Sequence, residues 1–296
     1  MRRIQAAGLV VSHTRDILFA SPGISVVDFR CMAHSGSAGP EEPNPTHSIV
    51  LVRRGVFCRT DRGQTLVADP NHILFFNSAH PYSYSHPIPG GDDCTILAVA
   101  APLALELVAR YAPGDAERPE TPFRLGSGLT SARAAHLHYE LLALVRRPAL
   151  ELTLEDVLTE LADEALSTAY EMRGIRAKND SLPTRALRKR RDLVEAAKLA
   201  INQNLETPPS LRELARALGC SSFHLSRTFH RTAGLSLRRY LSRLRVSVAA
   251  DRLASGAPDL TELALDLGYT DHSHFTNTFR HEWGLPPSRF RARYSR

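Results

Sequence analysis

The sequence predicts an α+β protein of two domains: a β-barrel or sandwich followed by two helices, then an all-α domain with two helix-turn-helix motifs joined by a spacer helix. The chain has 296 residues, about twice the length of a typical domain. Short apolar runs fill residues 20–100, whereas helical periodicity and an internal repeat fill the chain beyond residue 185. We therefore expect domains at 1–175 and 185–296, with a linker at 176–184.

The first domain begins with strand-like runs. Segments rich in Val, Ile and Phe alternate with Gly, Pro, Asn and Asp at intervals of about ten residues. Many short strands separated by such turns are typical of an antiparallel sandwich or barrel. The expected strands are 24–29, 48–52, 56–59, 66–68, 72–76 and 95–99.

Two amphipathic helices follow, at 131–146 and 153–170, because apolar residues recur there at helical spacing. We expect their polar faces to expose Arg133, His138 and Glu160. The helices either pack against the strands or form a homodimer interface, and both interpretations remain open. Residues 173–183 are poor in apolar side chains and contain Gly174 and Pro183, which is typical of a linker.

Charge is distributed unevenly. The net charge is +6, but residues 1–180 hold 17 Lys and Arg against 21 Asp and Glu, whereas residues 181–296 hold 20 against 10. A basic domain joined to an acidic one favours a polyanionic partner for the basic half. A merely solvated basic surface is the alternative that charge alone leaves open.

An internal repeat decides between them. The nine residues from Leu211 to Gly219 match those from Leu260 to Gly268 at six positions. Each copy predicts a short helix, a glycine able to adopt the left-handed conformation, a polar N-cap and a second helix with an apolar inner face. This order is that of a helix-turn-helix. The N-caps are Ser221 in the first copy and Thr270 or Asp271 in the second, and the inward residues are Leu225, Phe229, Phe275 and Phe279.

The second helix of each copy carries an outward polar face suited to base edges and phosphates. Residues 236–254 between the copies predict a rigid helix of about 28 Å, near the spacing of about 34 Å between successive major grooves on one face of B-DNA. The residues expected to contact DNA are Phe223, His224, Ser226, Arg227, Arg231, Arg239, His272, Ser273, Thr276, Asn277 and Arg280.

From about residue 193 to 293 the sequence resembles the AraC/XylS family of bacterial transcription regulators, most specifically in LTELALDLGYTDHSHFTNTFRHEWGLPPSRFRARY. The resemblance implies that Phe223, His224 and Arg227 face bases in one half-site. It likewise implies that His272, Ser273 and Asn277 face bases in the other. Many members have arginine at the position of Asn277. Because arginine favours guanine and asparagine favours adenine, we expect a different second half-site here.

The segment HILFFNSAHPYSYSHPIPGGDDCTILAV resembles, less specifically, the cupin-like sensory domain of that family. The resemblance implies a small organic effector, with His80, Tyr82, Tyr84 and His86 as its expected contacts. A metal-dependent cupin enzyme fused to a DNA-binding module is the alternative, with His47, His72, His80, His86 and Cys94 as tempting ligands. The stretch EEPNPTHSIVLVRRG holds one histidine where metal cupins have a pair, so we expect neither metal nor cofactor.

No Ser-His-Asp spacing, phosphate-binding glycine loop or H-E-x-x-H pattern indicates catalysis, so we expect no enzyme. The family implies a cytoplasmic activator whose partners are double-stranded DNA, RNA polymerase and the effector. A ligand-independent regulator controlled by partner proteins stays open. The apolar runs are shorter than the roughly 20 residues that span a bilayer, so we expect no membrane segment. The four cysteines form no C-x-x-C pair, and we expect reduced thiols, with Cys58 and Cys94 in the core.

Overall fold

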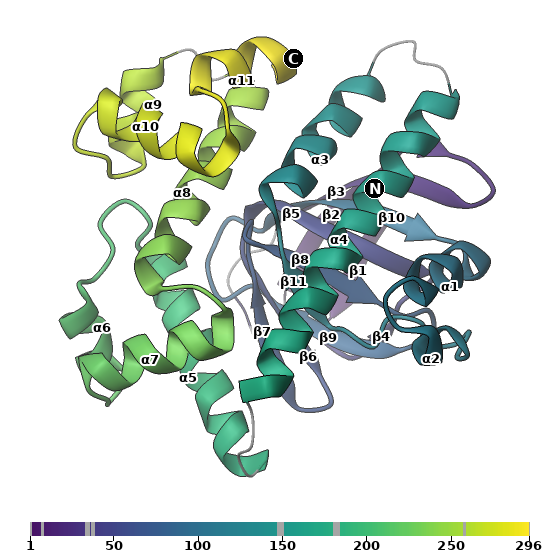
Figure 1. The fold of residues 1–296 in the computed structure, drawn as a ribbon, viewed down its shortest axis with the longest axis horizontal. Helices are drawn as coiled ribbons and strands as arrows, with labels where there is room; N and C mark the ends of the chain where they lie inside the picture. The colour runs from purple at the N-terminus through teal and green to yellow at the C-terminus, as the bar shows by residue number, and fades with distance from the viewer. Residues whose placement is uncertain are drawn as a thin grey trace. The chain divides into compact units, whose positions relative to one another are not determined.

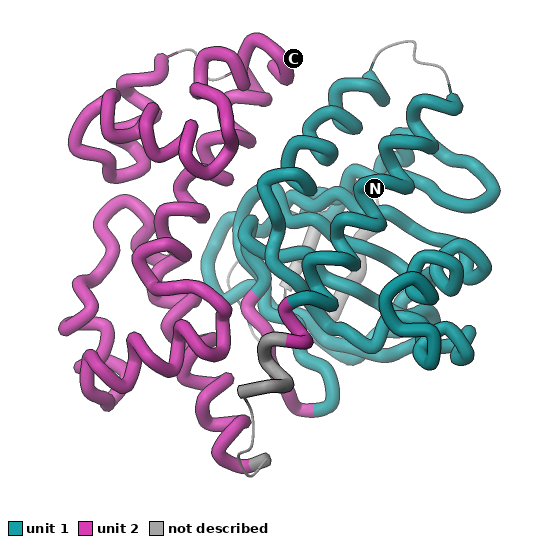
Figure 2. The backbone as a smooth tube through the Cα atoms, viewed as in Figure 1, with its two compact units in different colours: residues 1–62, 68–171, 296 teal, residues 63–67, 172–295 magenta. Residues whose placement is uncertain are grey.

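A computed structural model describes residues 2–6, 9–32, 36, 39–146, 151–179, 184–256 and 259–295. The chain forms two compact units (Figure 2): residues 1–62 with 68–171, and residues 63–67 with 172–295. The first unit combines strands and helices, and the second is helical apart from its short strand segment. The protein is therefore of mixed α+β class.

Eleven described strands form two antiparallel sheets. The larger sheet consists, in spatial order, of β1 (Arg2–Ala6), β2 (Leu9–Ala20), β3 (Ile24–Met32), β10 (Asp92–Val99), β5 (His47–Gly55), β8 (His72–Phe76) and β11 (Ser127–Leu129). The smaller consists of β4 (Glu42–Pro43), β9 (Pro81–Ser85), β6 (Phe57–Asp61) and β7 (Gln64–Ala68). All six expected strands are present, in β3, β5, β6, β7, β8 and β10.

Helices cover one face of the larger sheet (Figure 1). Alternate strand residues such as Ile49, Leu51 and Leu97 form a buried cluster with Leu141 of α3 and Leu161 of α4. The helices of this unit are α1 (Ala101–Ala109), α2 (Pro113–Ala116), α3 (Ala132–Leu144) and α4 (Glu151–Asn179) as far as residue 171. Because alternate strand residues point to opposite faces, the intervening side chains face the other way, where Phe76 meets Tyr82 of β9 with ring centroids 4.8 Å apart.

The two helices predicted in this unit are confirmed as α3 and α4, and Ser131 caps α3 by accepting a hydrogen bond from the Ala134 amide. The expected exposure of His138 is wrong. Its side chain is buried, with Nε2 2.7 Å from Thr95 Oγ1. It lies one helical turn from Ala134 and Leu141, on the face that packs against the sheet.

The expected linker at 176–184 also differs from the structure. The helix α4 continues to Asn179, and α5 begins at Thr184, so residues 176–179 and 184 are helical. A glycine inside a helix costs only about 1 kcal/mol relative to alanine, and Gly174 does not end α4. Residues 180–183 lie outside the described part of the chain.

In the second unit, α8 runs between two similar helix pairs (Figure 1). The helices are α5 (Thr184–Gln203), α6 (Leu211–Ala217), α7 (Ser222–Ala233), α8 (Leu237–Ala254), α9 (Leu260–Asp266), α10 (His272–Trp283) and α11 (Pro287–Tyr294). Within each pair, a glycine with positive φ ends the first helical segment: Gly219 at 67° and Gly268 at 72°. The predicted turn conformation is thus confirmed in both copies.

The predicted inner faces are confirmed as well. Leu225 and Phe229 of α7, and Phe275 and Phe279 of α10, are fully buried. Among the helices that the structure describes, none is long and apolar enough to cross a lipid bilayer.

Candidate nucleic-acid interface and ligand cavity

The helices α7 and α10 each present a polar face to solvent. On α7 the exposed side chains include Phe223, which is 73% exposed, together with His224, Ser226 and Arg227. On α10 the exposed side chains include His272, Ser273, Asn277 and Arg280. Apart from Phe223, the apolar side chains of both helices are buried on the opposite face, so most of the residues predicted to contact DNA are free of core packing.

Each of these helices starts from a side-chain cap. The Ser221 hydroxyl accepts a hydrogen bond from the His224 amide at 3.1 Å. Asp271 accepts one from the His274 amide at 2.8 Å, which selects Asp271 over Thr270 as the cap. A carboxylate at a helix N-terminus is stabilised by the amides and by the helix dipole, and these amides hold the pKa of Asp271 below its usual value. The caps fix where each polar face begins.

Two expected contact residues are less accessible than the others. Arg231 and Thr276 are half-buried. The Thr276 hydroxyl is buried with no hydrogen-bond partner among the described residues, so it lies off the exposed face. Thr276 follows the buried Phe275, and helical periodicity turns it partly toward the core.

The structure also shows interactions that hold the polar face of α10. Arg280 Nη2 donates to Asn277 Oδ1 at 3.2 Å, which fixes the orientation of the Asn277 amide. Arg239, at the start of α8, lies 3.8 Å from Glu282, a distance that leaves its largely exposed guanidinium free to turn toward a phosphate.

Arg245 of α8 is a structural residue that sequence reasoning missed. Its guanidinium donates to three backbone carbonyls, those of Leu205 at 3.0 Å, Glu206 at 2.9 Å and Gly268 at 3.1 Å. It therefore ties α8 both to the turn before α6 and to the turn between α9 and α10. Nothing in the periodicity of α8 distinguishes this arginine from the other arginines of the helix.

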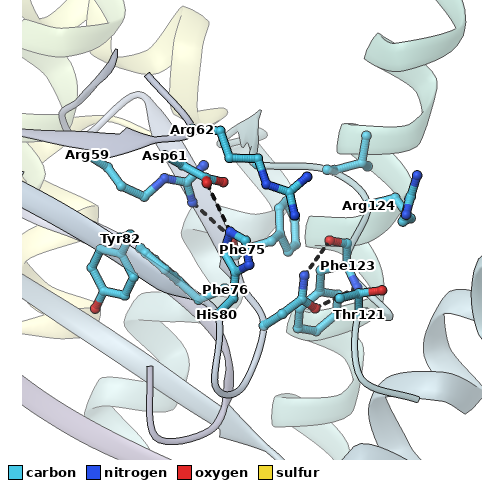
Figure 3. A pocket seen from close by; sticks show the side chains of 13 residues that line it. Arg59, Asp61, Arg62, Phe75, Phe76, His80, Tyr82, Thr121, Phe123 and Arg124 are labelled. Atoms are coloured by element: carbon cyan, nitrogen blue, oxygen red, sulfur yellow. Dashed lines mark hydrogen bonds and ion pairs between the residues drawn. The ribbon is translucent and has the colours of Figure 1, made fainter. Parts of the chain in front are cut away.

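The first unit contains a cavity of about 220 Å³ between β6, β8, β9 and the segment 121–126 (Figure 3). His80 and Tyr82, two of the four expected effector contacts, line it, whereas Tyr84 and His86 are not among the residues around it. Tyr82 and Tyr84 lie on the same face of β9, with ring centroids 6.4 Å apart. The cavity thus borders the first two of the four expected contacts in sequence order.

Arg59 of β6 lines this cavity and was missing from the sequence prediction. The residue is only 8% exposed, and burial lowers the pKa of its guanidinium. Nη1 donates to the Phe75 carbonyl at 3.0 Å, and the guanidinium carbon lies 4.9 Å from the centre of the Phe76 ring. Strand alternation could have indicated it, because Arg59 shares a face with the buried Phe57.

The histidines weighed as metal ligands are not gathered into one group. His47 Nδ1 accepts from the Ser78 amide at 3.1 Å, His72 lies 2.9 Å from Asp69, and His80 lies 2.9 Å from Asp61. These separate contacts give each ring its own partner. Among the histidines weighed as metal ligands, His86 is then the one that lies beside buried cysteines.

His86 belongs to a buried group with Cys31 and Asp92, whose ligand atoms lie within 4.8 Å of one another. His86 Nε2 is 2.6 Å from Asp92 Oδ1, and the Cys94 thiol donates to Oδ2 at 3.1 Å. Burial and Asp92 raise the pKa of Cys94, so this thiol keeps its proton. Both carboxylate oxygens therefore have partners within the protein, and we retain the expectation of no metal.

Comparisons with known proteins concern mainly the second unit. A family described as a helix-turn-helix domain matches residues 214–293. The multiple antibiotic resistance protein MarA of Escherichia coli K12 is 31% identical over 91 residues, which cover 31% of this chain and 72% of MarA. The regulatory protein SoxS of the same organism is 28% identical over 93 residues, covering 31% of this chain and 87% of SoxS.

Two solved structures match the chain over different extents. A transcriptional regulator from Chromobacterium violaceum with an AraC-type DNA-binding domain is 25% identical, covers 36% of this chain and 94% of its own, and has a TM-score of 0.34. ToxT from Vibrio cholerae is 11% identical. The match covers 93% of this chain and 100% of the ToxT chain, with a TM-score of 0.35.

Proposed function

Because this chain is a DNA-binding transcriptional regulator of the AraC/XylS family, we propose that α6–α7 and α9–α10 are two helix-turn-helix motifs that read two half-sites. We further propose that a small organic molecule in the first unit controls this binding. The observation that carries the proposal is the pair of exposed polar faces on α7 and α10, each set by the same capped turn.

Base reading is assigned to one long polar side chain on each face. Arg227 on α7 can donate two hydrogen bonds to O6 and N7 of guanine, and Asn277 on α10 can pair with N6 and N7 of adenine. Asn277 Oδ1 already accepts one bond from Arg280. Its second lone pair remains available for the adenine amino group, so the Arg280 bond orients the amide without blocking it.

Placement of the two faces is assigned to α8. This helix has 18 residues, a length of about 27 Å, and adjacent major grooves on one face of the duplex are about 34 Å apart. Arg231 and Arg239 are assigned to phosphates, because a point contact to the backbone positions a protein without reading sequence. The remaining expected contacts keep their assignments, except the buried hydroxyl of Thr276.

Control is assigned to the cavity lined by His80 and Tyr82, with Tyr84 further along β9 and His86 directly after the strand. The proposed regulator is an activator that contacts RNA polymerase. Homodimerisation is a further proposal. The apolar faces of α3 and α4 are used by the core of the first unit, so a dimer would rely on their outer faces, where Arg133 pairs with Glu160.

A fragment experiment tests the DNA-binding assignment. Residues 181–296 alone should fold and retard double-stranded DNA in a mobility-shift assay, whereas residues 1–171 should not. A fragment that is folded by circular dichroism but does not bind would contradict the assignment. Thermal denaturation of the full chain against a panel of metabolites separates effector control from the ligand-independent alternative, which predicts no stabilising compound.

A further inference from the structure

A buried positive charge without a counter-ion lies in the cavity of the first unit. No described carboxylate forms an ion pair with Arg59, and its Nε is buried without a hydrogen-bond partner in the described part of the chain. Asp61, the nearest acid on the same strand, has an oxygen 2.9 Å from His80 Nε2. A buried charge is costly unless it is paired. Such a group in a cavity therefore indicates a ligand of opposite charge.

The guanidinium has one edge left for that ligand. Nη1 is used by the Phe75 carbonyl, and Phe76 covers one face. The remaining edge, formed by Nε and Nη2, has the spacing that binds both oxygens of a carboxylate.

Gly126 packs closely beside this edge of the guanidinium. A Cβ atom at that position would lie 2.5 Å from Nη2, so any larger residue would displace the guanidinium or fill the space beside it. Gly126 itself lines the cavity. The absence of a side chain there is what allows the guanidinium of Arg59 to hold its position at the wall of the cavity.

The other walls match an organic anion. Arg62 and Arg124 are exposed side chains at the cavity (Figure 3). Three arginines against the single acid Asp61 favour a negative ligand. Phe75 and Phe123 are buried and supply apolar surface. The cavity of about 220 Å³ is somewhat larger than the cavity of about 150 Å³ that accommodates benzene in an engineered protein, so its occupant is small.

We propose that this cavity binds a small organic monocarboxylate, whose carboxylate pairs with the Nε–Nη2 edge of Arg59 and whose apolar body lies against Phe75, Phe76 and Phe123. This inference rests on the proposed effector control and gives the effector its chemical class. A phosphate ion shares the negative charge, but apolar walls and a single buried guanidinium edge favour a planar carboxylate over a more highly charged tetrahedral anion.

The test is a binding series on the full chain. Benzoate and hexanoate, their neutral amides and inorganic phosphate are titrated at millimolar concentrations by calorimetry and thermal denaturation. The expected result is saturable, stabilising binding of at least one carboxylate, with at least tenfold weaker binding of its amide and of phosphate. Binding of the amides as tightly as the carboxylates, binding of phosphate alone, or no saturable binding at all would each overturn the proposal.

Variants locate the site. Arg59→Gln and Gly126→Ala should each weaken carboxylate binding at least tenfold, the second while keeping the arginine. Arg54→Gln, which removes an exposed arginine paired with Asp93 on the neighbouring strands, is the matched control and should bind as the wild type does. Equal binding by Gly126→Ala and wild type would contradict the assigned edge even if Arg59→Gln fails to fold.

DNA retardation without ligand is measured on the same variants. It should be unchanged. If the wild-type chain without ligand does not retard DNA, the proposed function is refuted. The carboxylate proposal is then judged from the binding series alone.

Discussion

Gly219 and Gly268 occupy equivalent turns but have different surroundings, and this difference predicts unequal costs for the same substitution. Both have positive φ, at 67° and 72°. A Cβ atom at Gly219 would meet nothing within 4 Å, whereas one at Gly268 would lie 2.1 Å from the Glu206 carbonyl oxygen and 2.4 Å from Arg245 Nη2. Those two atoms are hydrogen-bonded to each other at 2.9 Å. A methyl group at Gly268 would therefore crowd both the donor and the acceptor of one bond.

The magnitudes follow from these contacts. Gly219→Ala should cost about 1–2 kcal/mol, the strain of an L-residue in the left-handed region. Gly268→Ala has the same strain and adds about 1–3 kcal/mol for overpacking and about 1.5–3 kcal/mol for the disrupted charged hydrogen bond. We expect Gly268→Ala to cost at least about 2 kcal/mol more than Gly219→Ala, because its additional clash involves backbone.

The assay uses Trp283, the single tryptophan of the chain, which is buried in α10. Its fluorescence during urea unfolding reports on the second helix pair, where it stacks against Phe279. Arg245→Ala completes a double-mutant cycle with Gly268→Ala. Because removing the guanidinium relieves part of the clash, the two losses of unfolding free energy should not add in the double variant. Equal costs for the two glycine substitutions, or additivity in the cycle, would refute this reasoning.

The other predictions concern pH, a cap and the core. Burial lowers the pKa of His138 to about 3. Its contribution to stability is therefore full above the unfolded pKa of about 6.5 and is lost as pH falls toward 3, by about 2 kcal/mol at pH 5. Scanning calorimetry of His138→Gln should show a smaller loss between pH 7.5 and 5, and an unchanged loss would contradict it. Asp271→Ala should destabilise the second helix pair by about 1 kcal/mol in urea unfolding followed by Trp283 fluorescence, and an effect on the calorimetric transition of the first unit alone would count against it. Leu161→Ala should destabilise the first unit by about 2–5 kcal/mol in calorimetry, and a neutral result would contradict the described core.

The repeat explains why the second unit was the more predictable. Its glycines, its capping residues and its inner faces depend on neighbours within a few positions, and two copies of the same pattern support one interpretation. Arg245 could not be predicted in this way, because the Gly268 carbonyl lies 23 residues away in sequence and the Glu206 carbonyl 39. The crowding at Gly268 depends on both of these distant contacts.

In the first unit, helical periodicity and strand alternation contained signals that the sequence prediction did not use. His138 lies one turn from two core residues, so helical periodicity did contain the signal for its burial. Arg59 was hidden by the general tendency of arginine to face water, although strand alternation placed it with Phe57. The helix α1 was not predicted, although its first turn contains Pro102 and proline is favoured at that position of a helix.

Of the four expected effector contacts, Tyr82 and Tyr84 lie two residues apart on β9, and strand alternation places them on the same face. Which of the four contacts border the cavity depends on the segment 121–126, about forty residues further along the chain. This segment folds against β8 through the hydrogen bond that the Phe75 amide donates to the Gly126 carbonyl. Such a pairing leaves no periodic signal in the sequence.

Selection from a randomised DNA library tests the central claim most directly, namely that α7 and α10 read two half-sites. The wild-type chain should enrich two conserved boxes about one helical turn apart. Arg227→Ala should flatten base preference in one box and Asn277→Ala in the other, each at a cost of about 1–3 kcal/mol at the selected site. Arg239→Ala should weaken binding to all sequences alike and preserve both boxes. A single enriched box, or the same sequence-independent loss in Arg227→Ala, Asn277→Ala and Arg239→Ala, would contradict the account.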